Sequence, residues 1–137
     1  MYEQLKLSNQ LCFPLYALSK EITRRYTPFL QALDLTYPQY LVMLVLWEHG
    51  EQSVGELGEK LYLDSGTLTP LLKRLQAKGL VERTRSIEDE RSVIIRLTNS
   101  GRVLEQQAVE IPGKMSQCLN LSADEIALLR KILAQSV

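Results

Sequence analysis

The hydrophobic residues in the first quarter of the chain recur every three or four positions. They fall at Leu7, Leu11, Leu15, Leu18, Ile22, Tyr26 and Phe29. This spacing places them on one face of a helix and predicts a long amphipathic α-helix from Leu7 onward. The segment 40–47 is apolar nearly all round, so we expect a second, buried helix that begins near Pro38 and ends at Gly50.

Polar residues mark the starts of two further helices. The sequence Ser-Val-Gly-Glu at 53–56 has the form of a capping box and predicts a short helix that ends near Leu61. Asp64 or Ser65 is suited to cap the next helix, because a short side chain bearing oxygen accepts a hydrogen bond from a free amide of the first turn. Gly79 is suited to end that helix in a left-handed conformation.

The pattern changes from helical to alternating after Gly79. Residues 80–86 and 91–98 are rich in β-branched and alternating side chains, and the acidic stretch 87–90 between them has the length of a hairpin loop. The sequence therefore predicts a β-hairpin directly after two short helices.

Helical periodicity returns after the hairpin. Thr98 or Asn99 is suited to begin a helix, and Pro112-Gly113 interrupts it. Ser122-Ala-Asp-Glu125 is a second capping box that opens a final amphipathic helix.

With 137 residues, the chain has room for one compact core. The fold class is mainly α with a small β-hairpin.

Charge is unevenly spread along a chain whose formal net charge is zero. Residues 1–72 carry five basic and eight acidic side chains, and residues 103–137 carry three and four. Residues 73–102 carry eight basic and four acidic side chains, an excess of +4. This basic segment is the part of the chain that a polyanion prefers, although such an excess is often only a solvated face.

Several classes of protein are excluded by what the sequence lacks. The longest apolar run, residues 40–47, is too short to span a bilayer, and the amino terminus lacks the order of a signal peptide. Cys12 and Cys118, 106 positions apart, resemble neither a secreted disulfide framework nor a zinc cluster. We therefore expect a cytoplasmic protein. His49 is the single histidine, which argues against a hydrolase or a metal site. A thiol peroxidase is disfavoured because the sequence has no arginine near Cys12, no thioredoxin-type pattern and no second cysteine at short spacing. We therefore expect no metal, no cofactor and no enzymatic activity.

Two helices joined by a short polar turn and followed by a basic hairpin form a winged helix-turn-helix, in which one helix enters the major groove of DNA. The candidate DNA contacts are Ser65, Thr67, Thr69, Lys73, Arg74, Arg85, Asp89 and Arg91. Asp89 is placed to orient Arg91. Taken singly, such residues are usually helix caps or solvated edge charges, but their order favours double-stranded DNA as the partner. Because Pro70 removes a helical hydrogen bond, we expect an irregular first turn in the recognition helix.

Several short motifs resemble the MarR family of dimeric bacterial repressors. They are Leu71-Leu-Lys-Arg-Leu75, Gly79-Leu-Val81, Asp89-Glu-Arg91 and Leu97-Thr98. Residues 10–13, 35–41 and 63–74 look like the organic-hydroperoxide-sensing, OhrR-type branch. The resemblance implies a winged helix-turn-helix over residues 37–98. It also implies a homodimer formed by helices from residues 1–36 and 99–137, bound to a palindromic operator.

Cys12 is the candidate sensor. A lone cysteine on an apolar helix face is most often inert packing. However, Cys12 and Tyr16 are spaced to share a helix face, and a phenol that donates to sulfur favours the reactive thiolate. Tyr26 lies about 21 Å further along a straight helix and cannot reach Cys12 of its own chain, whereas the partner's can. The resemblance implies that Tyr26 and Tyr37 of the other subunit bond to Cys12, with Tyr16 as a further member.

The chemistry implied is a peroxide switch. A thiolate attacks an oxygen of the hydroperoxide and becomes a sulfenic acid, which then condenses with a second thiol. In two-cysteine members of the branch this second thiol is a carboxy-terminal cysteine of the partner, and Cys118 lies in that region. The alternatives are that Cys118 is inert and a small cellular thiol completes the oxidation, or that the repressor is released by a small aromatic ligand instead.

Overall fold

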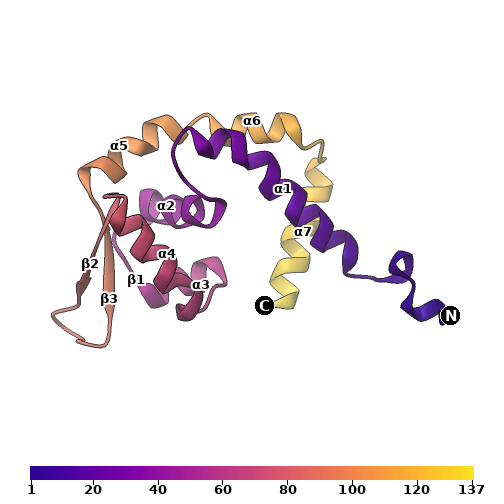
Figure 1. The fold of residues 1–137 in the computed structure, drawn as a ribbon, viewed down its shortest axis with the longest axis horizontal. Coiled ribbons are helices and arrows are strands. Elements are labelled where there is room, and N and C mark those ends of the chain that lie inside the picture. The colour runs from indigo at the N-terminus through magenta and orange to yellow at the C-terminus, as the bar shows by residue number, and fades with distance from the viewer.

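A computed structural model describes residues 1–137 and consists of seven α-helices and one small sheet (Figure 1). The first group of elements is α1 (Phe13–Gln31), α2 (Tyr37–His49), β1 (Gln52–Ser53), α3 (Val54–Leu61) and α4 (Ser65–Ala77). The second group is β2 (Val81–Arg85), β3 (Val93–Leu97), α5 (Asn99–Ala108), α6 (Ile111–Cys118) and α7 (Ala123–Ser136). Two short 3-10 turns, η1 (Glu3–Leu5) and η2 (Leu7–Asn9), precede α1. The predicted fold class, mainly helical with a β-hairpin, is confirmed.

Helix α2 forms the centre of the core, as its apolar sequence predicts. Val42 and Met43 have no exposed surface, and α2 contacts α1, α3, α4 and α5. Thr36 caps the helix: its hydroxyl accepts a hydrogen bond from the Gln39 amide at 3.3 Å, and the Gln39 side chain accepts one from the Thr36 amide at 3.1 Å. Such a reciprocal pair satisfies two amides at the helix start.

The predicted capping signals have the predicted partners. Both capping boxes, at Ser53 and at Ser122, are present. Asp64 is the cap of α4, because its carboxylate accepts the amide of Thr67 at 2.7 Å, so Ser65 becomes the first residue of the helix. Gly79 has a φ of 76°, which lets the chain leave α4 and turn into β2.

The long first helix begins later than its hydrophobic spacing predicts. Residues 3–9 form two 3-10 turns, and α1 starts at Phe13, with Cys12 as its N-cap residue. Pro14 explains the difference: it has no amide hydrogen, and its ring would clash with the carbonyl four residues earlier in a continuing helix. Proline is tolerated in a first turn, so the helix begins there.

The prediction of an irregular first turn in the recognition helix is wrong. Helix α4 runs without a break from Ser65 through Pro70 to Ala77. Pro70 leaves the carbonyl of Gly66 without its helical donor, and both residues are exposed, where water replaces that bond. The predicted interruption near Pro112 is confirmed, since α5 ends at Ala108 and α6 carries Pro112 in its first turn.

The hairpin forms as predicted, with one further strand. Strands β2 and β3 are antiparallel, with Val81 opposite Leu97 and Arg83 opposite Ile95. The two-residue strand β1 pairs with the other side of β3, giving the order β1-β3-β2. Figure 1 shows the sheet at one end of the molecule and α1 and α7 at the other, with α5 and α6 as the connection. No helix has the length and hydrophobicity needed to cross a membrane.

Two glycines, Gly101 in α5 and Gly113 in α6, test how closely these helices pack against the rest of the chain. A Cβ on Gly101 would overlap the backbone carbonyl of Leu80, whereas one on Gly113 would meet nothing within 4 Å. We expect Gly101→Ala to lower the free energy of unfolding by about 1–3 kcal/mol, the cost of overpacking. The control, Gly113→Ala, is expected to raise it by about 0.5–1 kcal/mol because alanine is the better helix former. Urea unfolding at one protein concentration measures both; equal effects would contradict the packing.

Candidate functional site

The start of α4 and the hairpin face one another across a groove of about 430 Å³. Ser65 and Thr69 line it from α4, and Asp89 and Arg91 line it from the hairpin loop. The first turn of α3 closes a further side. The structure therefore brings together four of the eight residues predicted to contact DNA.

The other four predicted contacts lie outside this groove. The Thr67 amide is bound to the cap residue of α4, and Lys73 and Arg74 are exposed one turn further along the helix. Arg85 donates from Nη1 to the carbonyl of Glu90 at 2.9 Å, which spans the hairpin loop. These residues border the groove region as exposed donors.

Asp89 bonds to the backbone of the hairpin loop and not to the side chain of Arg91. Its Oδ1 accepts a hydrogen bond from the Arg91 amide at 3.0 Å. Ser86 accepts bonds from the amides of Glu88 and Asp89 at 3.2 and 3.3 Å. Asp89 thus fixes the position of Arg91 through the chain, and no bond forms between the two side chains.

Arg83 is a groove residue that the sequence reasoning did not select. It lines the groove from β2, and its Nε is buried with no hydrogen-bond partner. A buried donor without a partner is rare and marks a place where a ligand or water is expected. The signal was available: residues two apart in a strand share a face, so Arg83 lies on the same face as Arg85.

Cys12 is an exposed free thiol at the start of α1. The amide of Tyr16 donates to the carbonyl of Cys12 at 3.2 Å, so the two residues lie one turn apart, as predicted. The Nζ of Lys20 lies 5.3 Å from the centre of the Tyr16 ring. The region around Cys12 is therefore open on the surface of the single chain.

Three tyrosines form a cluster at the other end of α1. The ring centres of Tyr26 and Tyr37 are 4.7 Å apart, and that of Tyr40 lies 5.7 Å from Tyr26 and 6.3 Å from Tyr37. Burial, and then the neighbouring phenols of Tyr37 and Tyr40, raise the pKa of Tyr26 to about 12. Burial also raises the pKa of Tyr37 and of Tyr40. All three hydroxyls therefore keep their protons at neutral pH and remain donors.

Cys12 and the tyrosine cluster are not brought together within one chain. The straight helix α1 separates Cys12 from Tyr26 by fourteen residues, about 21 Å at 1.5 Å per residue. Tyr40 was not predicted as a cluster member, although its spacing of three from Tyr37 places both on one side of α2.

Cys118 ends α6 and lies over α1. Its carbonyl accepts a hydrogen bond from Nη1 of Arg25 at 2.6 Å, and its thiol is free and exposed. Arg25 directly precedes Tyr26, so the end of α6 is anchored to α1 at the level of the tyrosine cluster. No group of three or more His, Cys, Asp or Glu residues is placed to hold a metal ion.

Comparison with known proteins places these features in a family. The model of the SarA/Rot transcriptional regulators matches residues 24–107, more than half of the chain. The organic hydroperoxide resistance transcriptional regulator of Bacillus subtilis is 52% identical over 132 residues, covering 96% of this chain and 90% of that protein. The chain belongs to the MarR family of transcriptional regulators. The predicted family is confirmed, and the relatives are transcriptional regulators.

Solved structures agree with this assignment over the whole chain. Reduced AbfR bound to DNA matches with a TM-score of 0.80 and 39% identity, covering 98% of this chain and 95% of that one. AbfR in its disulfide form matches with a TM-score of 0.71 and 39% identity, covering 97% and 93%. This MarR-family chain is thus closer in conformation to the DNA-bound form than to the disulfide form.

The raised pKa of Tyr26 gives a pH prediction. Because the folded protein holds this proton more tightly than a free tyrosine, with its ordinary pKa of 10, the resulting stability is present below pH 10 and lost as the pH rises through about 12. We expect Tyr26→Phe to remove the latest component of the tyrosinate absorbance titration and to flatten the alkaline loss of stability. Tyr62→Phe, at an exposed site, should leave that late component in place.

Proposed function

We propose that the chain is a homodimeric repressor that releases a palindromic operator when an organic hydroperoxide oxidises Cys12. One observation carries the proposal. The chain has an exposed thiol and a cluster of protonated phenols, and the thiol cannot reach the phenols of its own chain. The 52% identity to a regulator of organic hydroperoxide resistance supports this reading.

The groove between α4 and the hairpin supports DNA as the ligand. A helix of this length fits the major groove, and a basic hairpin beside it reaches the neighbouring backbone. Thr69 and Ser65 offer short hydroxyl donors at the start of α4, whereas Arg83 and Arg91 offer guanidinium groups for phosphate oxygens. Two of the eight basic residues of the segment 73–102 therefore line the surface where a duplex would lie.

The exposed apolar faces of α1 and α7 support a dimer. Their exposed large hydrophobic residues are Phe13, Leu15, Tyr16, Leu18, Ile126, Leu128, Leu129, Ile132 and Leu133. Figure 1 shows that these two helices lie at the same end of the molecule, away from the sheet. Apolar surface of this extent marks an interface, and the same patch on both copies produces a two-fold dimer.

In such a dimer, Tyr26 and Tyr37 of one subunit donate hydrogen bonds to Cys12 of the other. Bonds to the charged form of a thiol favour the thiolate, which is the nucleophile. The sulfur attacks one oxygen of the hydroperoxide and the O–O bond breaks. Cys12 becomes a sulfenic acid, and the substrate leaves as the alcohol after taking up a proton.

Cys118 of the partner then resolves the sulfenic acid. Its sulfur attacks the sulfur of Cys12, water leaves, and a disulfide joins the two subunits. Disulfide geometry requires the two Cα atoms to lie within about 7 Å, so oxidation has to bring Cys12 of one subunit to the end of α6 of the other, where Arg25 holds the carbonyl of Cys118. Movement of the dimer helices then displaces the two recognition helices from half-sites one turn of DNA apart, about 34 Å.

An apolar hollow of about 260 Å³ beside Tyr37 supports an organic signal. Leu15, Leu18 and Ile22 of α1 line it together with Leu129 of α7. An alkyl or aryl group bound there would direct a hydroperoxide toward the sensor. A small aromatic ligand would fit the same hollow, which is the specific observation in favour of a repressor released by ligand binding.

Arg83 gives a test of the DNA-binding groove. Arg83→Met removes one cation from the groove, so the slope of log affinity against log salt should fall in magnitude by about 0.9. The loss should be similar for operator and scrambled duplexes, because phosphate contacts carry no sequence information. Arg96→Met is the control, since Arg96 is paired with Glu51 at 2.9 Å and lies outside the groove. Fluorescence anisotropy over a salt series measures both variants.

Cys12 gives the test of the switch. Cys12→Ser should bind an operator selected in vitro as tightly as the unaltered protein, yet remain bound after treatment with cumene hydroperoxide. Release of this variant by peroxide would overturn the redox mechanism, and release by an aromatic compound alone would favour the ligand mechanism. A gel-shift titration measures binding in each case.

The same treatment tests Cys118 on a non-reducing gel. The oxidised protein should migrate as a covalent dimer, and Cys118→Ser should migrate as a single chain. A covalent dimer that persists in Cys118→Ser would assign the second thiol elsewhere.

A further inference from the structure

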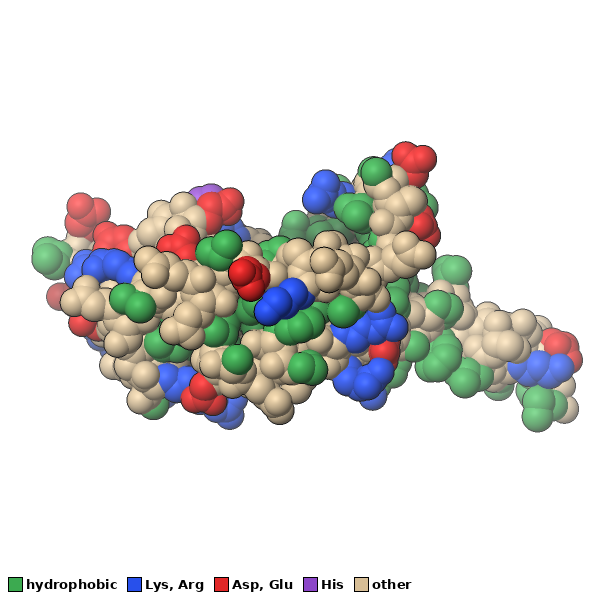
Figure 2. Space-filling view, turned by 90° about the horizontal axis from the view of Figure 1, so that it is seen from above, with side chains coloured by type: hydrophobic (Ala, Val, Ile, Leu, Met, Phe, Trp, Pro, Cys, Tyr) green, Lys and Arg blue, Asp and Glu red, His purple; other side chains and the backbone are tan.

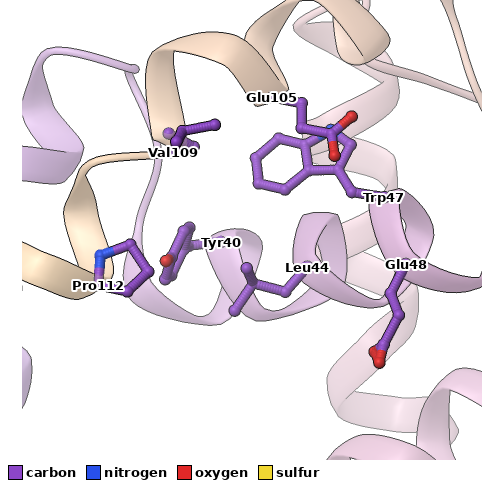
Figure 3. A pocket seen from close by; sticks show the side chains of 8 residues that line it. Tyr40, Leu44, Trp47, Glu48, Glu105, Val109 and Pro112 are labelled. Atoms are coloured by element: carbon purple, nitrogen blue, oxygen red, sulfur yellow. The ribbon is translucent and has the colours of Figure 1, made fainter.

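A second apolar hollow, of about 300 Å³, lies between α2 and the α5–α6 connection (Figure 3). Tyr40, Leu44 and Trp47 line it from three successive turns of α2, and Val109 and Pro112 line it from the opposite side. Leu44 is 38% exposed and Val109 is 69% exposed. A hollow so apolar and so open requires a cover.

The amino-terminal arm, residues 1–11, is an apolar segment without a partner. Leu7 is 60% exposed and Leu11 is 90% exposed. The arm is nevertheless ordered by its own bonds, since Asn9 donates to the Glu3 carbonyl at 2.7 Å and Gln10 donates to the Lys6 carbonyl at 2.8 Å. Figure 2 shows this arm projecting from the body of the molecule with hydrophobic side chains on its surface.

We propose that the arm of each subunit fills the α2–α5 hollow of the other subunit. The inference rests on the proposed dimer, in which Cys12 of one chain lies against Tyr26 and Tyr37 of the other. The arm cannot fill the hollow of its own chain, because the nineteen residues of α1 hold it about 28 Å from the α1–α2 junction. Only a second copy can supply it.

Tyr40 connects the sensor to the hollow. Its ring packs against both tyrosines of the sensor cluster and also forms one wall of the hollow. When Cys12 of the partner reaches the cluster, its neighbour Leu11 lies beside Tyr40. Leu7 is four residues further on, and because only Leu7–Asn9 form a 3-10 turn while Gln10 is extended, the segment can span at most about 14 Å. The hollow extends along α2 from Tyr40 to Trp47 by about 10 Å, which lies within that reach.

Charge complementarity supports the same occupant. Glu48 and Glu105 are among the residues that line the hollow; Glu48 lies 3.2 Å from His49, and Glu105 has no ion-pair partner in its own chain. The arm carries Lys6 between its apolar residues, where it pairs with Glu3 in the single chain. A docked arm would bring this ammonium group to Glu105, whose carboxylate lies over Trp47, while its leucines enter the hollow (Figure 3).

Docking would give the arm a role in sensing. Cys12 lies between the arm and α1, so a docked arm fixes the sensor cysteine on its amino-terminal side while the helix fixes it on the other. The hydroperoxide-reactive thiol is then held against phenols of the partner by residues that take no part in the chemistry. Leu7 and Leu11 are therefore positioning residues.

Disulfide mapping tests the proposal in a full-length chain in which Cys12→Ser and Cys118→Ser remove the native thiols. Leu7→Cys and Val109→Cys are added together, and mild oxidation should give a covalent dimer on a non-reducing gel. The matched control replaces Val109→Cys with Gln107→Cys, which is exposed on the opposite face of α5 and should give only the background of Leu7→Cys alone.

Size-exclusion chromatography of the same proteins shows whether the chain is a dimer, and so distinguishes failure of the docked arm from failure of the proposed dimer. A dimer that forms the Leu7–Val109 cross-link and not the control cross-link supports the docked arm. A dimer with no selective cross-link overturns it and leaves the hollow to another occupant, such as a small ligand. A monomer would overturn the proposed dimer itself, and the arm with it.

Discussion

Helix α2 is held on nearly every side by α1, α3, α4 and α5, and the side chains at its centre have no exposed surface. Each buried aliphatic or aromatic side chain of this kind contributes about 1.5–3 kcal/mol relative to exposure. A helix packed in this way does not bend locally; it moves as a unit with the elements that touch it. Its first residue, Tyr37, belongs to the tyrosine cluster, and the helix also contacts α3 and α4.

One polar contact reinforces this connection. Lys78, at the end of α4, donates to the buried side chain of Gln39 at 3.0 Å and to the backbone carbonyl of Asp34. Gln39 also completes the cap at the start of α2, two residues from Tyr37. The end of α4 is therefore bonded to the first turn of α2, which carries Tyr37 and Tyr40 of the tyrosine cluster. Displacement of those tyrosines by a neighbouring subunit would reach α4 through a short chain of packed and hydrogen-bonded groups.

The sequence predicted those features whose causes are local. The capping boxes, the left-handed Gly79 and the buried α2 each follow from a few adjacent residues, and each has the predicted form. Strand β1 was missed because two residues acquire strand geometry only by pairing with β3, some forty positions away. Arg83 and Tyr40 were missed for a related reason: their roles come from walls supplied by distant segments. The late start of α1 was a different kind of error, in which hydrophobic periodicity was given more weight than Pro14.

The absence of net charge defines how such a protein can bind and release DNA. A uniformly basic chain would hold DNA in many orientations, because counterion release depends on the number of phosphates neutralised and not on their sequence. Here the basic excess is confined to residues 73–102, and the rest of the chain is acidic. Affinity then depends on two grooves engaging at once, since the second contact benefits from the high effective concentration set by the first. A change in dimer geometry that prevents simultaneous engagement removes this benefit without altering either groove. In the proposed dimer, a redox event at the interface between subunits, remote from DNA, would therefore be sufficient to release the operator.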